Sequence, residues 1–207
     1  MTRPTETDSR ATFALAAHAF ADLVDRIPAD AWSGDGLGEW DLRALVGHAS
    51  RSLVTVLTYL PQVTEVEAVP TPVAYYAAAA QLMAADPAAV TERGRQAGQA
   101  LGDDPASTVR ELVDDCRTAL DAVDDPVIHT IAGGMRLSRY LVTRVFELVV
   151  HSLDIAGATG LPFDPPPAAL AESLRLAVDV AIARQDGSRL LLALTGRRAL
   201  PEGFSVV

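Results

Sequence analysis

Apolar residues recur at helical spacing along most of the chain. Positions three and four residues apart share one face of a helix, and the apolar positions keep that step over long stretches. Long helices are therefore predicted over four ranges: 9–27, 41–60, 105–123 and 137–158. The second of them starts at Asp41, a good N-cap residue, and ends before Pro61. Four long helices with short connections predict a mainly α fold built on a four-helix bundle.

Two shorter segments lie between these helices. The alanine-rich residues 71–101 predict two short helices with a break near Asp86-Pro87. The segment PVIHTIAGGM, residues 126–135, is β-like or irregular, with Gly133-Gly134 as the expected turn.

The C-terminal part begins with the rigid linker LPFDPPP. A last helix is predicted over residues 167–186, and the tail SRLLLALTGRRALPEGFSVV predicts a short strand, a turn and a second short strand. We expect residues 1–160 to form a metal-binding helical bundle. Residues 161–207 are expected to form a short appendage of linker, helix and two strands.

The helix predicted over 137–158 carries one line of polar residues in an otherwise apolar cylinder. Steps of four, three, four and three residues separate the members of this polar seam, which are Tyr140, Arg144, Glu147, His151 and Asp154. Those steps place all five side chains on one narrow face. A surface helix would show a broad polar face, so the pattern predicts a buried helix whose charges point to the interior or to a cleft.

Composition narrows the class of protein. The chain has 207 residues, 49% of them hydrophobic, with a net charge of −10 and arginine as its only basic residue apart from histidine. An acidic chain without a basic run is a poor ligand for nucleic acid or for an anionic membrane surface. The single cysteine, Cys116, excludes an intrachain disulfide, and neither a signal peptide nor a membrane-spanning run is evident. We expect a soluble cytoplasmic protein, either a monomer or a homodimer.

Two residues of the polar seam have the spacing of metal ligands. Glu147 and His151 are four residues apart and leave the same helix face about one turn from each other. His48 lies among core-type residues of the second helix and is the best candidate for a third ligand. Three such ligands leave one position open, as in catalytic zinc sites, although ferrous iron uses the same donors. Asp154 is placed to accept the proton of the other ring nitrogen of His151.

The same residues also permit a purely structural interpretation. A buried histidine can simply be hydrogen-bonded, and Arg144 and Glu147 can form a structural ion pair while Asp154 faces water. Spacing and composition leave both interpretations open.

The segments EWDLRALVGHASRSL and GGMRLSRYLVTRVFELVVHSLDIAGATG together resemble the mycothiol-dependent maleylpyruvate isomerase family, a branch of the DinB-like four-helix bundles. The resemblance lies in W-x-x-x-x-L-x-x-H, here Trp40, Leu45 and His48, and in R-x-x-E-x-x-x-H-x-x-D, here Arg144 to Asp154. The closing LLLALTGRRALPEGFSVV is similar to the tail of actinobacterial members.

The resemblance implies a function. It implies that His48, Glu147 and His151 bind a divalent metal, usually zinc, and that mycothiol is the thiol cosubstrate. It leaves Tyr140, Arg144 and Asp154 as residues that support the ligands or contact the substrate, and it assigns no catalytic residue. Metal coordination deprotonates a thiol, so the expected activity is isomerisation or conjugation of a small electrophile. The alternatives are a metal-binding or ligand-binding module without catalysis, and a structural protein with a vestigial site.

Overall fold

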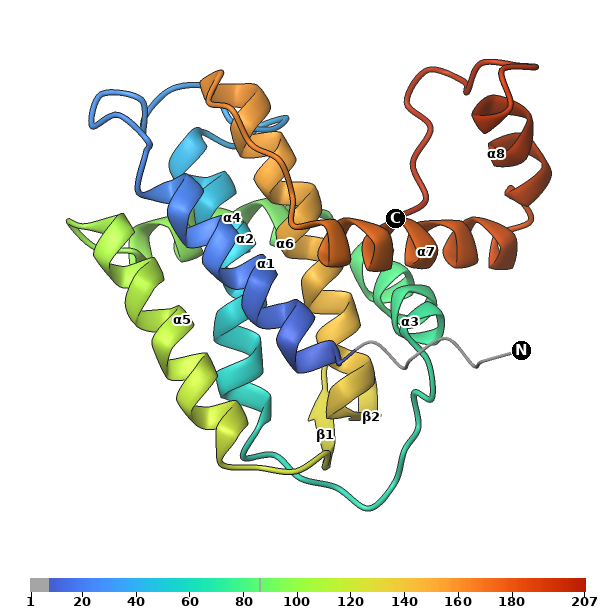
Figure 1. Cartoon of the computed structure of the whole chain (residues 1–207), viewed down its shortest axis with the longest axis horizontal. Coiled ribbons are helices and arrows are strands. Elements are labelled where there is room, and N and C mark those ends of the chain that lie inside the picture. The colour runs from blue at the N-terminus through green and yellow to red at the C-terminus, as the bar shows by residue number, and fades with distance from the viewer. Residues whose placement is uncertain (1–7, 86) are drawn as a thin grey trace.

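Four long helices form the centre of the fold, as the apolar spacing predicts. The computed structural model describes residues 8–85 and 87–207 (Figure 1). The central helices are α1 (Ser9–Val24), α2 (Leu42–Tyr59), α5 (Pro105–Asp121) and α6 (Leu137–Thr159). Both α1 and α2 pack against α5 and α6, so α1 and α2 lie on one diagonal of the bundle and α5 and α6 lie on the other. The predicted mainly α fold with a helical bundle is confirmed.

The helix ends follow the local signals in the sequence. The Asp41 carboxylate accepts a hydrogen bond from the Ala44 amide at 2.7 Å, which confirms the predicted N-cap of α2. Asp104 caps α5 in the same way, and Pro105 occupies its first turn. Gly160 closes α6 in the left-handed conformation, with φ of +70°. Helix α1 ends three residues earlier than predicted, at Val24.

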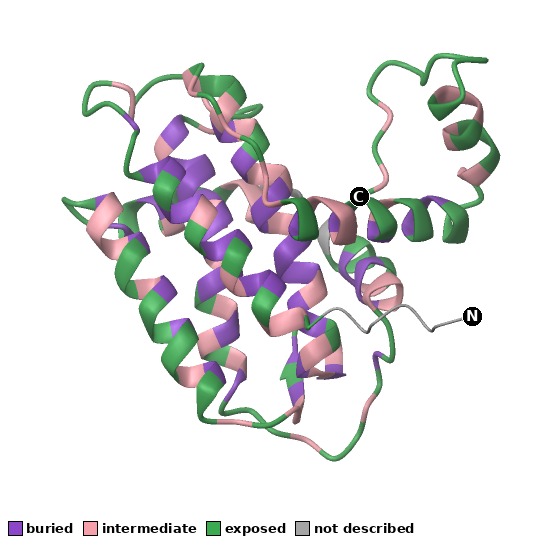
Figure 2. Cartoon of the chain, viewed as in Figure 1, coloured by how far each residue is buried: buried purple, intermediate pink, exposed green. Residues whose placement is uncertain are grey.

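Buried residues lie mainly on the inner faces of the four helices (Figure 2). The core consists of aromatic and branched side chains from every bundle helix, including Phe13, Phe20, Leu45, Leu53 and Leu148. Burying one such side chain stabilises a fold by about 1.5–3 kcal/mol. The core therefore fixes the positions of the helices that carry the polar seam and His48.

Two helices lie outside the central four. These are α3 (Pro72–Ala85), which packs against α6 and α7, and α4 (Pro87–Ala100), which packs along α2. The break between them agrees with the prediction, although Asp86 itself and residues 1–7 lie outside the described part of the chain. Helix α4 approaches α2 backbone to backbone, because a Cβ on Gly47 would meet the Gly98 nitrogen at 2.1 Å.

A small antiparallel sheet precedes α6. Strand β1 (Val127–Thr130) pairs with β2 (Gly133–Arg136), so the β-like segment is confirmed. The predicted turn was wrong, because Gly133 and Gly134 lie in β2 and the turn falls on residues 131–132. Gly133 has a φ of +115°, and Gly134 admits the neighbouring backbone, since a Cβ there would meet the Val66 carbonyl oxygen at 2.0 Å.

The C-terminal tail folds differently from the prediction. After α7 (Pro167–Ala183), residues Gly187–Leu194 form α8, and no strand follows within the described residues. Leu190, Leu191 and Leu194 of the tail line a groove beside Val178 and Ile182 of α7, at helical rather than alternating spacing. A short apolar run does not distinguish helix from strand by its periodicity. In the structure the tail residues of α8 pack on α7.

Helix α7 lies against α1, α3 and α6, whereas α8 has no buried residue and projects from the molecule (Figures 1 and 2). The chain then returns to α7, where Arg184 donates a hydrogen bond to the Val206 carbonyl oxygen at 2.9 Å. The division at residue 160 into bundle and appendage stays a prediction.

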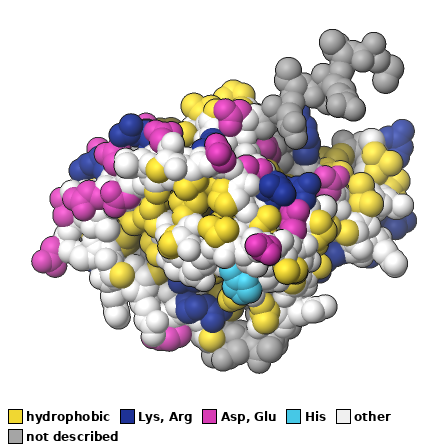
Figure 3. All heavy atoms as spheres, turned by 90° about the horizontal axis from the view of Figure 1, so that it is seen from below, with side chains coloured by type: hydrophobic (Ala, Val, Ile, Leu, Met, Phe, Trp, Pro, Cys, Tyr) yellow, Lys and Arg dark blue, Asp and Glu magenta, His cyan; other side chains and the backbone are white. Residues whose placement is uncertain are grey.

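The outer surface mixes charges of both signs. On the face drawn in Figure 3, arginine side chains lie among acidic ones and do not form a single basic patch. In the part of the chain that the structure describes, no helix combines the length and the apolar character that crossing a bilayer requires.

The close approach of α2 and α4 makes a specific stability prediction. We expect Gly47→Ala to destabilise the fold by roughly 1–3 kcal/mol, because its Cβ would collide with backbone atoms of α4 that cannot rotate away. Gly157→Ala is the matched control. Gly157 lies in α6, and a Cβ added there would meet nothing within 4 Å, so alanine should stabilise the helix by about 0.5–1 kcal/mol. Urea unfolding of both variants measures the difference, and equal effects would contradict the packing described.

Candidate metal centre

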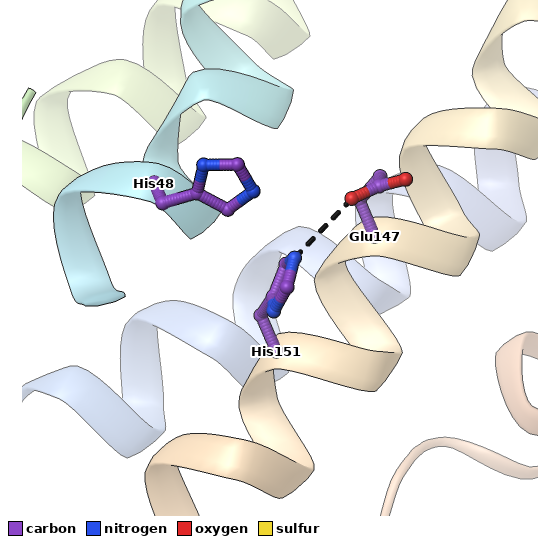
Figure 4. A group of neighbouring side chains, drawn as sticks. All are labelled: His48, Glu147 and His151. Atoms are coloured by element: carbon purple, nitrogen blue, oxygen red, sulfur yellow. Dashed lines mark ion pairs between the residues drawn. The ribbon is translucent and has the colours of Figure 1, made fainter. Parts of the chain in front are cut away.

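Helices α2 and α6 bring the three predicted ligands together. His48 extends from α2 toward Glu147 and His151 on α6 (Figure 4). One potential ligand atom from each residue lies within 4.8 Å of the other two. All three side chains are partly buried, and together they are the only such group of histidine, cysteine or acidic residues in the described ranges. The side chains point into one space between two helices that the core holds in place.

His151 is held at both ring nitrogens. Its Nδ1 lies 3.0 Å from Asp154 Oδ2, and its Nε2 lies 3.3 Å from Glu147 Oε2. Burial lowers the pKa of His151, but the hydrogen bonds to Asp154 and Glu147 outweigh burial and raise the pKa to about 9. At neutral pH the ring is therefore an imidazolium between two carboxylates, and Asp154 occupies the position that the sequence predicted.

Glu147 is ionised although it lies in the interior. Burial raises the pKa of its carboxyl group, but His151 and the positive charge of Arg144 outweigh that effect and bring the pKa to about 2. Its second oxygen, Oε1, accepts a hydrogen bond of 2.6 Å from the Tyr76 hydroxyl. Burial and the charge of Glu147 hold the pKa of Tyr76 well above its usual value, so Tyr76 keeps its proton and remains a donor.

His48 is held in a different way. Its ring stands edge-on to His151, with centroids 4.8 Å apart, and lies on the Trp40 ring, with centroids 4.5 Å apart. Burial and the neighbouring His151 lower its pKa to about 4, so the ring is neutral at pH 7. Its Nδ1 is buried without a hydrogen-bond partner in the described residues. A neutral imidazole has one nitrogen lone pair free to bind a metal.

The other two residues of the polar seam lie deeper. Arg144 is 8% exposed, donates to Thr143 Oγ1 at 3.1 Å, and lies over the rings of Tyr75 and Tyr140. The ion pair of Arg144 with Glu147 that the structural interpretation allowed is absent from the ion pairs of the described residues, so the charge of Arg144 acts on Glu147 over a longer distance. Tyr140 is fully buried and donates to Thr55 Oγ1 at 2.8 Å, so it supports Arg144 and lies apart from the ligand group.

Sequence reasoning missed two residues, Tyr75 and Tyr76. They come from α3, whose alanine-rich sequence gave no sign of contact with α6. Their one distinguishing signal is a pair of tyrosines in a run of small residues, which predicts an aromatic contact but not its partner.

The group has the chemistry of a divalent metal site. It offers two imidazoles and one carboxylate, the donor set that suits zinc or ferrous iron. His48 also fits, because its ring is neutral at pH 7 and one of its nitrogens faces the other two side chains (Figure 4). His151 Nε2 and Glu147 Oε2 are 3.3 Å apart, within the roughly 3–4 Å expected around a bound ion, and no two of the three ligand atoms are more than 4.8 Å apart.

The raised pKa of His151 predicts how the stability of the metal-free protein depends on pH. The folded chain holds this proton more tightly than the unfolded chain, whose histidine pKa is about 6.5. The stabilisation is therefore complete below pH 6.5 and is lost as the pH rises through about 9. It amounts to roughly 3 kcal/mol.

Urea unfolding between pH 6 and 10, in the presence of a chelator, measures this loss. The variant His151→Gln should be less stable at pH 7 and should lack the decline above pH 6.5. A wild-type protein without that decline would contradict the ionised pair.

One of three comparisons with known proteins identifies a family for this chain. No curated protein and no solved structure matches the chain. A family model described as the mycothiol maleylpyruvate isomerase N-terminal domain matches residues 13–156, which is more than half of the chain and includes His48, Glu147 and His151. The chain therefore belongs to the mycothiol maleylpyruvate isomerase N-terminal domain family.

Proposed function

We propose that this chain is a thiol-dependent metalloenzyme that uses mycothiol as cosubstrate to isomerise or conjugate a small electrophile. The convergence of His48, Glu147 and His151 between α2 and α6 is the observation that carries the proposal. Family membership supports mycothiol as the thiol. Zinc is the proposed metal because two imidazoles and a carboxylate are among its usual ligands.

Neighbouring groups set the orientation or the charge of each proposed ligand. Asp154 accepts a hydrogen bond from His151 Nδ1, so that Nε2 is the nitrogen directed toward the group. Tyr76 holds Oε1 of Glu147 and leaves Oε2 facing His151. His48 is already neutral at pH 7, so it loses no proton when it becomes a ligand.

The proposed chemistry needs an open position and an acidic thiol. Within the described residues no fourth histidine, cysteine or acidic side chain joins the group, so three protein ligands leave a position for an exogenous molecule. A divalent cation held there lowers the pKa of a thiol so that thiolate is available at neutral pH.

The fate of the electrophile decides the reaction class. The thiolate sulfur adds to one carbon of an electron-poor double bond, and the electron pair moves onto the adjacent carbonyl group. Rotation about the resulting single bond and expulsion of the thiolate give the isomer, with no net change in atoms. Protonation of the adduct instead gives the conjugate.

Arg144 is best placed to act indirectly. The rings of Tyr75 and Tyr140 cover its guanidinium group, and its charge keeps Glu147 ionised. We propose that it supports the carboxylate ligand and does not itself contact the electrophile.

Metal binding should release a proton. At pH 7 only His151 among the three proposed ligands carries a proton that the metal must displace. Calorimetric titration with zinc in buffers of different ionisation enthalpy should therefore show about one proton released per ion, falling toward zero above pH 9.

The variant His151→Ala should lose stoichiometric binding and keep its helical circular dichroism. His18→Ala is the matched control, because His18 is exposed on α1 and contacts the Ala14 carbonyl oxygen of its own helix through Nδ1. Stoichiometric zinc binding by His151→Ala would exclude the proposed ligand set.

Thiol-dependent turnover tests the enzyme itself. The zinc-loaded protein should bind mycothiol in a calorimetric titration and should isomerise or conjugate at least one member of a panel of small unsaturated electrophiles. Glu147→Gln should reduce the rate at least as far as it reduces zinc occupancy. Zinc binding with neither thiol binding nor turnover would favour the alternative, a metal-binding module without catalysis.

A further inference from the structure

The two histidines of the centre are oriented by different means. His151 has Asp154 at Nδ1, 3.0 Å away, whereas the Nδ1 atom of His48 is buried with no hydrogen-bond partner among the described residues. Histidine ligands are ordinarily oriented by a hydrogen bond from the nitrogen that does not bind the metal. Another contact must fix the rotation of the His48 ring.

The Trp40 indole supplies that contact. Its ring lies on the His48 imidazole with centroids 4.5 Å apart and planes inclined by 32°. The His151 ring stands edge-on at 4.8 Å, so His48 has ring neighbours from two directions. Stacking restricts the turning of an imidazole in the way that a hydrogen bond at Nδ1 would, without requiring a polar partner.

Helix α4 in turn holds the indole. The Trp40 Nε1 atom donates a hydrogen bond to the Thr91 carbonyl oxygen at 2.9 Å. Directly beneath the ring lies Gly94, where a Cβ would come within 2.5 Å of Trp40 Cε2. Trp40 is therefore clamped between α4 and His48, and the missing side chain at residue 94 provides the room.

We propose that Trp40 is a positioning residue for the metal centre, that it orients His48 as a ligand, and that Gly94 makes this orientation possible. The inference rests on the proposed metal site. It assigns to α4, which contributes no ligand, a part in metal affinity.

The test measures metal affinity in the full-length protein after removal of metal by a chelator. Zinc affinity is obtained by competition with a chromophoric chelator. In a separate measurement, cobalt(II) is added in place of zinc, and its visible absorption reports the number of ligands. Trp40→Leu removes the stacked ring and should weaken binding by about 10–100-fold, the usual effect of losing a residue that orients a ligand. Trp40→Phe keeps an aromatic face and should recover most of that loss.

Gly94→Ala tests the same contact without changing Trp40. Its methyl group should displace the indole and weaken binding in the same direction, and it carries the test if Trp40→Leu fails to fold. Trp32→Leu is the matched control, since Trp32 is the other tryptophan of the chain and is not the one that stacks on His48. This variant should bind zinc as the wild type does.

Fluorescence supplies a readout that activity does not. In the Trp32→Phe background the remaining emission comes from Trp40, and it should change in proportion to metal bound, because the ion would bind the ring on which Trp40 is stacked.

The outcomes separate the two proposals. Absence of metal binding in the wild type overturns the proposed function and this inference with it. A second outcome overturns only the role of Trp40 and leaves the proposed function standing. In that outcome His48→Ala loses metal binding, whereas folded Trp40→Leu and folded Gly94→Ala both keep the wild-type affinity and the wild-type cobalt spectrum. Weakened binding in these two variants, with near-normal binding in Trp40→Phe and Trp32→Leu, supports the positioning role.

Discussion

An ionised carboxylate in the interior of a protein must be compensated, and Glu147 is the group on which this structure depends. Removing a charge from water without partners costs far more than one hydrogen bond returns. Here the compensation comes from His151 on the same helix, from the Tyr76 hydroxyl on α3 and from the charge of Arg144. Because these groups belong to different segments, satisfying one carboxylate fixes how α3 and α6 lie together.

The same constraint separates the structural and metal-binding interpretations of the polar seam. A structural cluster would be complete once Glu147, His151 and Asp154 had satisfied one another. His48 adds no charge to such a cluster, because burial and the neighbouring His151 lower its pKa and keep its ring neutral at pH 7. Its presence is understandable as a donor to an ion, which favours the metal-binding interpretation.

The features that the sequence predicted correctly depend on residues that are close together in the chain. The spacing of Glu147, His151 and Asp154 defines one helix face whatever surrounds it, and the Asp41 cap depends only on a few neighbouring residues. The contact of Tyr76 with Glu147 joins residues 71 positions apart, and no spacing within either helix reveals it. The tail was misassigned for a related reason. Its leucines suit a strand or a helix equally, and only the neighbouring face of α7 decides between them.

The proton shared by His151 and Glu147 also bears on the order of events in the cell. Many small metal sites consist of unpaired ligands that cannot come together until the ion arrives, so folding must wait for metal. In this chain an internal cation already neutralises the carboxylate, and the bundle has its own apolar core. The apolar core and this internal ion pair do not require a metal ion to form. Loading of the proposed metal site would then be an exchange between a proton and an ion, governed by the free metal concentration and the pH of the surrounding solution.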